Sequence, residues 1–223
     1  MEFTLLWAAL TAVVFAWLGT RIWHERLPDH ATDRMVGAAA AGLLVGRLVA
    51  MLLQGMNPLT NPADILIVRG GVHTGTATVA ALGSYLWAAN WKVAYLDATA
   101  PAALMGLAGW HTGCLWRGAC LGTESSLPWA WAQSGSLITR HPVELYAAIG
   151  LILGGWVVSR LSWRILTRAG VALALAGLVR LLTEPMRPSI TGGPVGWYLA
   201  AIAFGLAAAW AGRRLLTNLD PPT

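Results

Sequence analysis

The sequence predicts an all-α integral membrane protein, built as a single bundle of seven transmembrane helices. Two observations lead to this fold class: the composition of the chain and the presence of seven long apolar stretches. Of the 223 residues, 57% are hydrophobic and only 11% are charged, whereas about a quarter of the residues in a soluble domain are charged. Because so few charged side chains cannot cover a water-exposed surface, we expect the chain to lie in a lipid bilayer.

Each apolar stretch is close to the length that a bilayer requires. A transmembrane helix needs about 20 mostly apolar residues. The predicted spans are residues 3–20, 35–54, 70–89, 93–116, 142–159, 165–183 and 194–212. The first is expected to remain as a helix, because it carries Glu2 where a cleaved signal peptide has basic residues. No composition shift divides the spans, so residues 1–223 are predicted to form one transmembrane domain.

Small and aromatic residues support these spans. The second, fourth and seventh stretches are rich in Gly and Ala, which let helix backbones pack closely in lipid. Several of the 13 tryptophans lie at the ends of stretches, where indole rings favour the membrane–water interface. Examples are Trp23 after the first stretch, Trp91 before the fourth and Trp197 in the seventh.

The distribution of cations predicts the orientation. Seven spans place the two termini on opposite sides of the membrane. With the N-terminus periplasmic and the C-terminus cytoplasmic, the inner segments hold nine of the 15 Lys and Arg residues, as the positive-inside rule requires. The net charge of +5 is therefore interpreted as membrane topology. No nucleic-acid partner is expected, because the cations form no basic stripe.

Ionisable residues gather at the outer ends of four predicted spans. A polar side chain at membrane depth is costly, so each one is a candidate for function. The candidates are Arg69, His73, His111, Arg117, Arg140, His141, Glu144, Tyr146, Arg180, Glu184 and Arg187. Arginine presents a planar donor fork that suits phosphate oxygens, and histidine exchanges a proton near neutral pH. Together these residues predict a site that binds a phospholipid head group and catalyses a displacement at it.

Each candidate also has a structural interpretation. An arginine at a helix end can snorkel toward the interface. Arg180 and Glu184 can form an ion pair between residues four apart on one helix, and His141-Pro142 can simply begin a helix. A transporter or channel is less expected, because the ionisable residues lie at one face and do not trace a path through the midplane.

Five motifs occur in the same order as in one known family. They are Gly46-Arg47-Leu48, Asn61-Pro62-Ala63-Asp64-Ile65 followed by Gly70-Gly71 and a nearby histidine, Asp97-Ala98-Thr99-Ala100-Pro101, Arg140-His141-Pro142-Val143-Glu144-Leu145-Tyr146, and Arg180-Leu-Leu-Thr-Glu184-Pro-Met-Arg187. The fourth resembles the pattern His-Pro-x-Gln-Leu-Tyr, and the fifth resembles Arg-Phe-x-x-Glu-x-x-Arg. On these motifs the chain resembles the prolipoprotein diacylglyceryl transferase family, bacterial inner-membrane enzymes with seven transmembrane helices.

The chain departs from that family in its signature loop. The family pattern reads Gly-Arg-x-Gly-Asn-x-x-x-Gly, and the best alignment here begins at Trp110 and ends at Gly118. His111 stands in place of the arginine, and Cys114 stands in place of the asparagine. Arg117, further along the same segment, is a candidate for the missing cation.

The resemblance implies a function and roles for the candidates. The family transfers the diacylglyceryl group of phosphatidylglycerol to the lipobox cysteine thiol of a preprolipoprotein, a step of lipoprotein biosynthesis. The implied partners are this phospholipid and the prolipoprotein signal peptide. The implied location is the bacterial inner (cytoplasmic) membrane, crossed several times. No metal or organic cofactor is implied.

Two classes of role follow from the resemblance. The catalytic candidates are Arg180, His73, His141 and His111, with Arg180 as the phosphate clamp and His73 or His141 assisting deprotonation of the thiol. The substrate-binding candidates are Arg187, Glu184, Arg140, Tyr146, Glu144, Arg117 and Gly113. Glu184 is expected to orient Arg180, and Tyr146 to donate a hydrogen bond to the lipid head.

Two alternatives remain beside this function. The altered signature loop is compatible with a catalytically silent or re-purposed relative that binds lipid. It is also compatible with a related transferase that uses another lipid or another acceptor.

Overall fold

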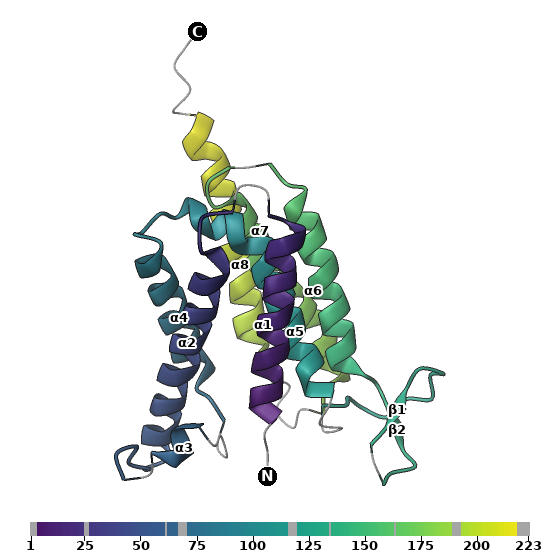
Figure 1. Ribbon diagram of the computed structural model, residues 1–223. Helices are drawn as coiled ribbons and strands as arrows, with labels where there is room; N and C mark the ends of the chain where they lie inside the picture. The colour runs from purple at the N-terminus through teal and green to yellow at the C-terminus, as the bar shows by residue number, and fades with distance from the viewer. Residues whose placement is uncertain are drawn as a thin grey trace.

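The protein is described by a computed structural model that is almost entirely helical (Figure 1). The structure describes residues 4–24, 27–60, 62–66, 71–115, 120–133, 135–162, 164–188 and 193–217. In this part of the chain, the seven longest helices are α1 (Thr4–Ile22), α2 (Ala31–Leu53), α4 (Thr74–Ala88), α5 (Ala94–Leu115), α6 (Val143–Ser159), α7 (Thr167–Thr183) and α8 (Val195–Thr217). Each overlaps one of the predicted spans.

Three shorter features lie between the long helices. They are the one-turn helix α3 (Ala63–Leu66), the 3-10 turn η1 (Glu184–Met186) and a hairpin of strands β1 (Trp131–Ala132) and β2 (Thr139–Arg140). The strands are antiparallel, with Trp131 opposite Arg140. The hairpin is a difference from the predicted all-α fold, because it lies in a connection that the apolar pattern does not assign to any element.

The long helices run alternately between two ends of the molecule (Figure 1). The start of α1, α3 and the hairpin lie at one end, which we call the N-terminal end, and the last turns of α8 lie at the other end. Among the described helices, three are long and apolar enough to cross a membrane, namely Ala31–Leu53, Thr167–Met186 and Val195–Arg214. The predicted helical class and apolar character are therefore confirmed.

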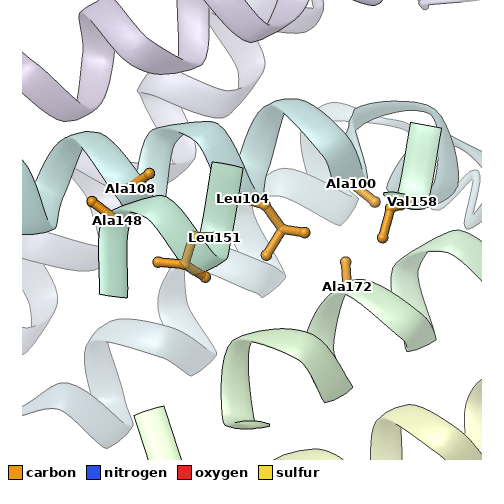
Figure 2. Packing of buried hydrophobic residues seen from close by; sticks show 7 residues of the cluster. All are labelled: Ala100, Leu104, Ala108, Ala148, Leu151, Val158 and Ala172. Atoms are coloured by element: carbon orange, nitrogen blue, oxygen red, sulfur yellow. The ribbon is translucent and has the colours of Figure 1, made fainter. Parts of the chain in front are cut away.

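Helix α5 lies at the centre of the packing, in contact with α1, α6 and α7. A buried core joins α5 to its neighbours (Figure 2): Ala100, Leu104 and Ala108 of α5 face Leu151 of α6 and Ala172 of α7. On the opposite side, α2 packs against α4. Most of these contacts involve small residues, which is the packing expected for helices in lipid.

A buried carboxylate anchors the start of α7, the helix that carries Arg180. Asp97, on α5, accepts hydrogen bonds from the backbone N–H of Leu166 at 2.5 Å and of Ala169 at 2.8 Å. These are N–H groups at a helix start, which have no partner within the helix. Asp97 therefore sets the position of α7 relative to α5.

The close approach of α1 and α5 depends on Gly109. A Cβ atom at this position would overlap the carbonyl oxygen of Thr11 and lie 2.7 Å from the Cβ of Phe15. We expect Gly109→Ala to lower the free energy of unfolding by about 1–3 kcal/mol, because the extra methyl group forces the two helices apart. Thermal unfolding of the purified protein in detergent measures this loss.

Gly83→Ala is the matched control. Gly83 also lies within a helix, but a Cβ atom there would meet nothing within 4 Å. Since alanine favours a helix over glycine by about 1 kcal/mol, this variant should be at least as stable as the unaltered protein. Equal losses in the two variants would contradict the role assigned to Gly109.

Candidate functional site

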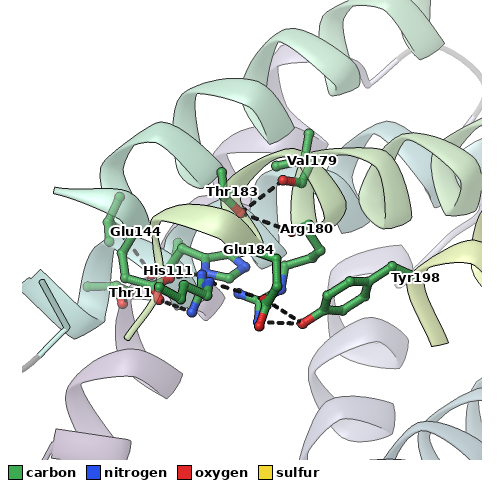
Figure 3. Close-up of polar contacts among 11 residues, drawn as sticks. Thr11, His111, Glu144, Val179, Arg180, Thr183, Glu184 and Tyr198 are labelled. Carbon is green, nitrogen blue, oxygen red and sulfur yellow. Dashed lines mark hydrogen bonds and ion pairs between the residues drawn. The ribbon is translucent and has the colours of Figure 1, made fainter. Parts of the chain in front are cut away.

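A continuous chain of polar contacts links four helices at the N-terminal end of the bundle (Figure 3). In order of contact, its members are His111, Glu144, Arg187, Glu184, Tyr198 and Arg180. We call these six residues the polar network. They come from the last turn of α5, the first turn of α6, the η1 turn and the residue after it, the first turns of α8 and the last turn of α7.

Glu144 holds the first half of the network together. One of its oxygens, Oε2, contacts His111 Nδ1, and the other, Oε1, lies 2.6 Å from Arg187 Nη1. The side chains of His111 and Glu144 are only 7% and 9% exposed. A buried carboxylate is tolerated when its lone pairs are matched by donors, and here both oxygens have one.

Arg187 has donors that its two carboxylates do not use. Its Nε lies 3.7 Å from Glu184 Oε2, which is an ion pair but is too long for a hydrogen bond. Within the described part of the chain, Nε and Nη2 are buried without a hydrogen-bond partner. Buried donors are rarely left unmatched, so Arg187 has hydrogen-bonding capacity to offer to a further acceptor.

Tyr198 connects Arg180 to Glu184 in the second half of the network. Arg180 Nη2 donates to the Tyr198 hydroxyl at 3.0 Å, and that hydroxyl donates to Glu184 Oε2 at 3.1 Å. The guanidinium of Arg180 also lies 5.4 Å from the centre of the Tyr198 ring. The alternative interpretation, a direct ion pair between Arg180 and Glu184, is not found among the described contacts, because the Tyr198 hydroxyl links the two groups.

Gly122 and Thr123, which precede α6, make backbone hydrogen bonds to the two elements that carry the glutamates of the network. Gly122 N–H donates to the carbonyl of His141 at 2.7 Å, and Thr123 N–H donates to the carbonyl of Met186 at 2.8 Å. A Cβ atom at Gly122 would overlap both Met186 and Val143. This segment thus ties the start of α6, which carries Glu144, to η1, which carries Glu184.

A family model described as prolipoprotein diacylglyceryl transferase matches residues 3–211. The chain belongs to this family. The resemblance inferred from the motifs is therefore confirmed, and with it the general class, since the family consists of membrane transferases.

Curated relatives carry the name phosphatidylglycerol–prolipoprotein diacylglyceryl transferase. The protein from Chlamydia trachomatis is 28% identical over 158 residues, covering 64% of this chain and 57% of that protein. The protein from Polaromonas naphthalenivorans is 30% identical over 142 residues, covering 58% of this chain and 52% of that protein. Against these two relatives, the chain spans little more than half of their length. The protein from Methylibium petroleiphilum is 28% identical over an alignment of 244 positions, covering 93% of this chain and 92% of that protein.

The network contains five of the residues singled out from the family motifs: Arg180, His111, Arg187, Glu184 and Glu144. The sixth member, Tyr198, is absent from that set. Its position near the start of the last apolar stretch places it at the same end as Arg180, but no spacing rule connects residues on two different helices.

Three other candidates, Arg140, His141 and Tyr146, form a separate group of contacts with residues 122–132, which we call the hairpin segment. Arg140 donates to the carbonyl of Gly122 at 3.3 Å and lies 3.9 Å from Glu124. Tyr146 accepts a hydrogen bond from Trp129 Nε1 at 2.8 Å, and its hydroxyl lies 3.4 Å from His141 Nδ1. No hydrogen bond or ion pair among the described residues joins these three side chains to the polar network.

His73 lies at the start of α4, in the part of the bundle formed by α2 and α4. Its Nδ1 accepts a hydrogen bond from the backbone N–H of Thr76 at 3.3 Å, so the ring caps the helix. The side chain is exposed, and nothing in the described ranges connects it to the network.

The two remaining candidates come from the signature segment. Gly113 packs on α1, where a Cβ atom would overlap Ala8 and Thr11, so the glycine permits a close helix contact. Arg117, together with Arg69, lies outside the described residues. Within the described ranges, no three His, Cys, Asp or Glu side chains converge where a metal ion could bind.

The Tyr198 hydroxyl should contribute measurably to stability. We expect Tyr198→Phe to lower the free energy of unfolding by about 1–3 kcal/mol, because it removes two hydrogen bonds to charged groups and leaves the ring in place. Thermal unfolding in detergent measures the change. Tyr95→Phe is the control, since the Tyr95 hydroxyl makes no hydrogen bond to a described residue and the variant should unfold like the unaltered protein. A loss no larger than that of Tyr95→Phe would contradict the bridging role.

Proposed function

We propose that this protein transfers the diacylglyceryl group of phosphatidylglycerol to the lipobox cysteine thiol of a prolipoprotein. The observation that carries the proposal is the polar network itself: two arginines, two glutamates, a tyrosine and a histidine from four helices and the η1 segment, brought together at one end of an apolar bundle. Family membership supplies the reaction class. The names of the relatives supply the two substrates.

The reaction places three demands on the site. The cysteine sulfur must lose its proton, because the thiolate is the nucleophile. The sulfur then bonds to the glyceryl carbon while the bond from that carbon to the phosphate oxygen breaks. Glycerol phosphate leaves with the electron pair, so negative charge develops on the phosphate and must be stabilised.

Arg180 is the proposed phosphate clamp. Its one hydrogen bond within the described part of the chain is the one from Nη2 to Tyr198, and a guanidinium has five N–H donors. Its other donors are therefore available to phosphate oxygens. Arg187 assists through the donors that neither glutamate uses. Arg140 is less suited to this task, because Glu124 and the carbonyl of Gly122 engage it.

The proposed topology is a sevenfold crossing of the bacterial inner membrane, with the network at its periplasmic face. Two features support this orientation. Arg21 in the last turn of α1, Arg34 in the first turn of α2 and Lys92 just before α5 lie at the end opposite to the network, where the positive-inside rule predicts the cytoplasm. At the network's own end, Cys120 is disulfide-bonded, and disulfides persist in the oxidising periplasm but are rare in the cytosol.

Substitution of Arg180, the proposed phosphate clamp, tests the proposed transfer reaction. The purified protein, in vesicles that contain phosphatidylglycerol, should attach a diacylglyceryl group to a lipobox peptide. Arg180→Ala should slow this transfer by about 10²–10³-fold, as expected when a fixed donor to a developing charge is lost. Mass spectrometry of the peptide measures the product.

Arg213→Ala is the matched control, because Arg213 is an exposed arginine at the opposite end of α8. Its rate should equal that of the unaltered protein. Transfer that survives Arg180→Ala would contradict the clamp. Retained binding of the lipid without any transfer by the unaltered protein would favour the silent relative, and transfer from another lipid alone would favour the related transferase.

A further inference from the structure

Two residues that differ from the family motifs are in contact with each other. His111 stands where the signature loop has arginine, and Glu144 stands where the pattern His-Pro-x-Gln-Leu-Tyr has glutamine. The two positions are 33 residues apart, on α5 and α6, yet their side chains contact each other through His111 Nδ1 and Glu144 Oε2. Because each change supplies the partner that the other requires, we treat them as one coupled unit.

We propose that His111 accepts the proton of the substrate thiol and that Glu144 is the positioning residue that holds its imidazole ready. This inference rests on the proposed function, because a thiol proton must be removed only if the protein carries out the transfer. It assigns a role that neither the motifs nor the names of the relatives specify.

The contact with Glu144 determines which ring nitrogen of His111 is basic. A carboxylate oxygen accepts hydrogen bonds, so the neutral imidazole donates from Nδ1 and carries its lone pair on Nε2. Nε2 makes no hydrogen bond within the described part of the chain. The nitrogen that can take a proton is thus the one that remains free.

Neither of the other histidines at this end has that arrangement. His73 Nδ1 accepts the backbone N–H of Thr76, so its neutral ring carries the hydrogen on Nε2 and has no free lone pair. The one hydrogen bond of His141 Nδ1 within the described residues is to the hydroxyl of Tyr146, at 3.4 Å. Among these three histidines, His111 alone is held by a carboxylate, the arrangement that stabilises an imidazolium after proton uptake.

The charged groups that face His111 in the described part of the chain come from α6 and the η1 segment. Glu144 of α6 also contacts Arg187, whose Nη1 lies 2.6 Å from Glu144 Oε1. The Nε of the same arginine lies 3.7 Å from Oε2 of Glu184 in η1. The neighbouring part of α1 contributes Ala8 and Thr11, which do not titrate. Glu144 is therefore shared between the imidazole of His111 and the guanidinium of Arg187.

The proposed step is a nucleophilic displacement at the glyceryl carbon. The thiol proton moves to His111 Nε2, and the sulfur keeps the electron pair and attacks the glyceryl carbon. The bond from that carbon to the phosphate oxygen breaks, and the leaving glycerol phosphate carries the additional negative charge. The proton on His111 then passes to the departing phosphate or to water.

Variants of His111 distinguish a proton acceptor from a residue with a purely structural role. In His111→Gln the rate of transfer to the lipobox peptide should fall by about 10²–10⁴-fold, while the KM for phosphatidylglycerol stays within twofold. The unaltered protein should gain rate with pH in a single step, and this step should be absent from His111→Gln. Imidazole added to His111→Gly should restore part of the rate, which a merely structural role would not allow.

A double-mutant cycle tests whether the two residues act as a unit. Glu144→Gln should also slow the reaction, because an amide that donates to Nδ1 selects the wrong tautomer. The double variant should then be no slower than His111→Gln alone. The control is His30→Gln, which removes a histidine paired with Asp33 at 3.2 Å at the opposite end of the molecule and should leave the rate and the pH step unchanged.

The outcomes distinguish this inference from the proposed function. If the unaltered protein transfers lipid and Arg180→Ala does not, but His111→Gln keeps both the rate and the pH step, the inference alone is overturned. Losses that multiply in the double variant would overturn the coupling. Absence of transfer by the unaltered protein under all conditions would overturn the proposed function and, with it, the proton acceptor.

Discussion

The buried carboxylate of Glu144 is the interaction on which the rest of the polar network depends. It lies between the imidazole of His111 and the guanidinium of Arg187, and all three side chains are largely removed from solvent. Removal of one partner from such a group leaves an unmatched charge in an apolar surrounding, which costs far more than the pair contributes. The hairpin segment, the η1 turn and the close packing of α1 on α5 can all be understood as the scaffold that keeps these charges matched.

The apolar stretches were sufficient to predict the helices, since length and hydrophobicity depend only on local sequence. The same reasoning predicted that arginines, histidines and carboxylates would gather at one end, because helices that alternate in direction bring every second connection to the same side. The Arg180–Glu184 pair marks the limit of this approach. Spacing of four residues predicts a direct contact on one helix, but the structure inserts Tyr198 of α8 between the two groups.

The position of Tyr198 depends on the packing of α8 against α7, which a rule about residue spacing along one helix does not describe. Gly177 lies one turn before Arg180 on α7, and a Cβ atom there would lie 2.8 Å from the carbonyl oxygen of Tyr198. The missing side chain lets α8 approach closely and places the Tyr198 hydroxyl beside the guanidinium. Likewise, neither His73 nor Arg140 could be excluded from the network by sequence. Both lie at the predicted end of the bundle, but a helix cap and a hairpin contact engage them.

The composition of the network also suits a reaction in which charge moves. Two guanidinium groups and two carboxylates cancel, so the six residues carry no net charge while His111 is neutral. A family member with arginine and glutamine at positions 111 and 144 would carry two more positive charges at the same place. In the proposed mechanism, the network would gain one positive charge when His111 takes up the thiol proton, and the leaving phosphate would gain one negative charge. An electrostatic site is most effective when it favours the transition state over the bound substrate. A positive charge on His111 that arises only with proton transfer would meet this requirement. A permanent cation would instead stabilise the bound substrate and the transition state alike.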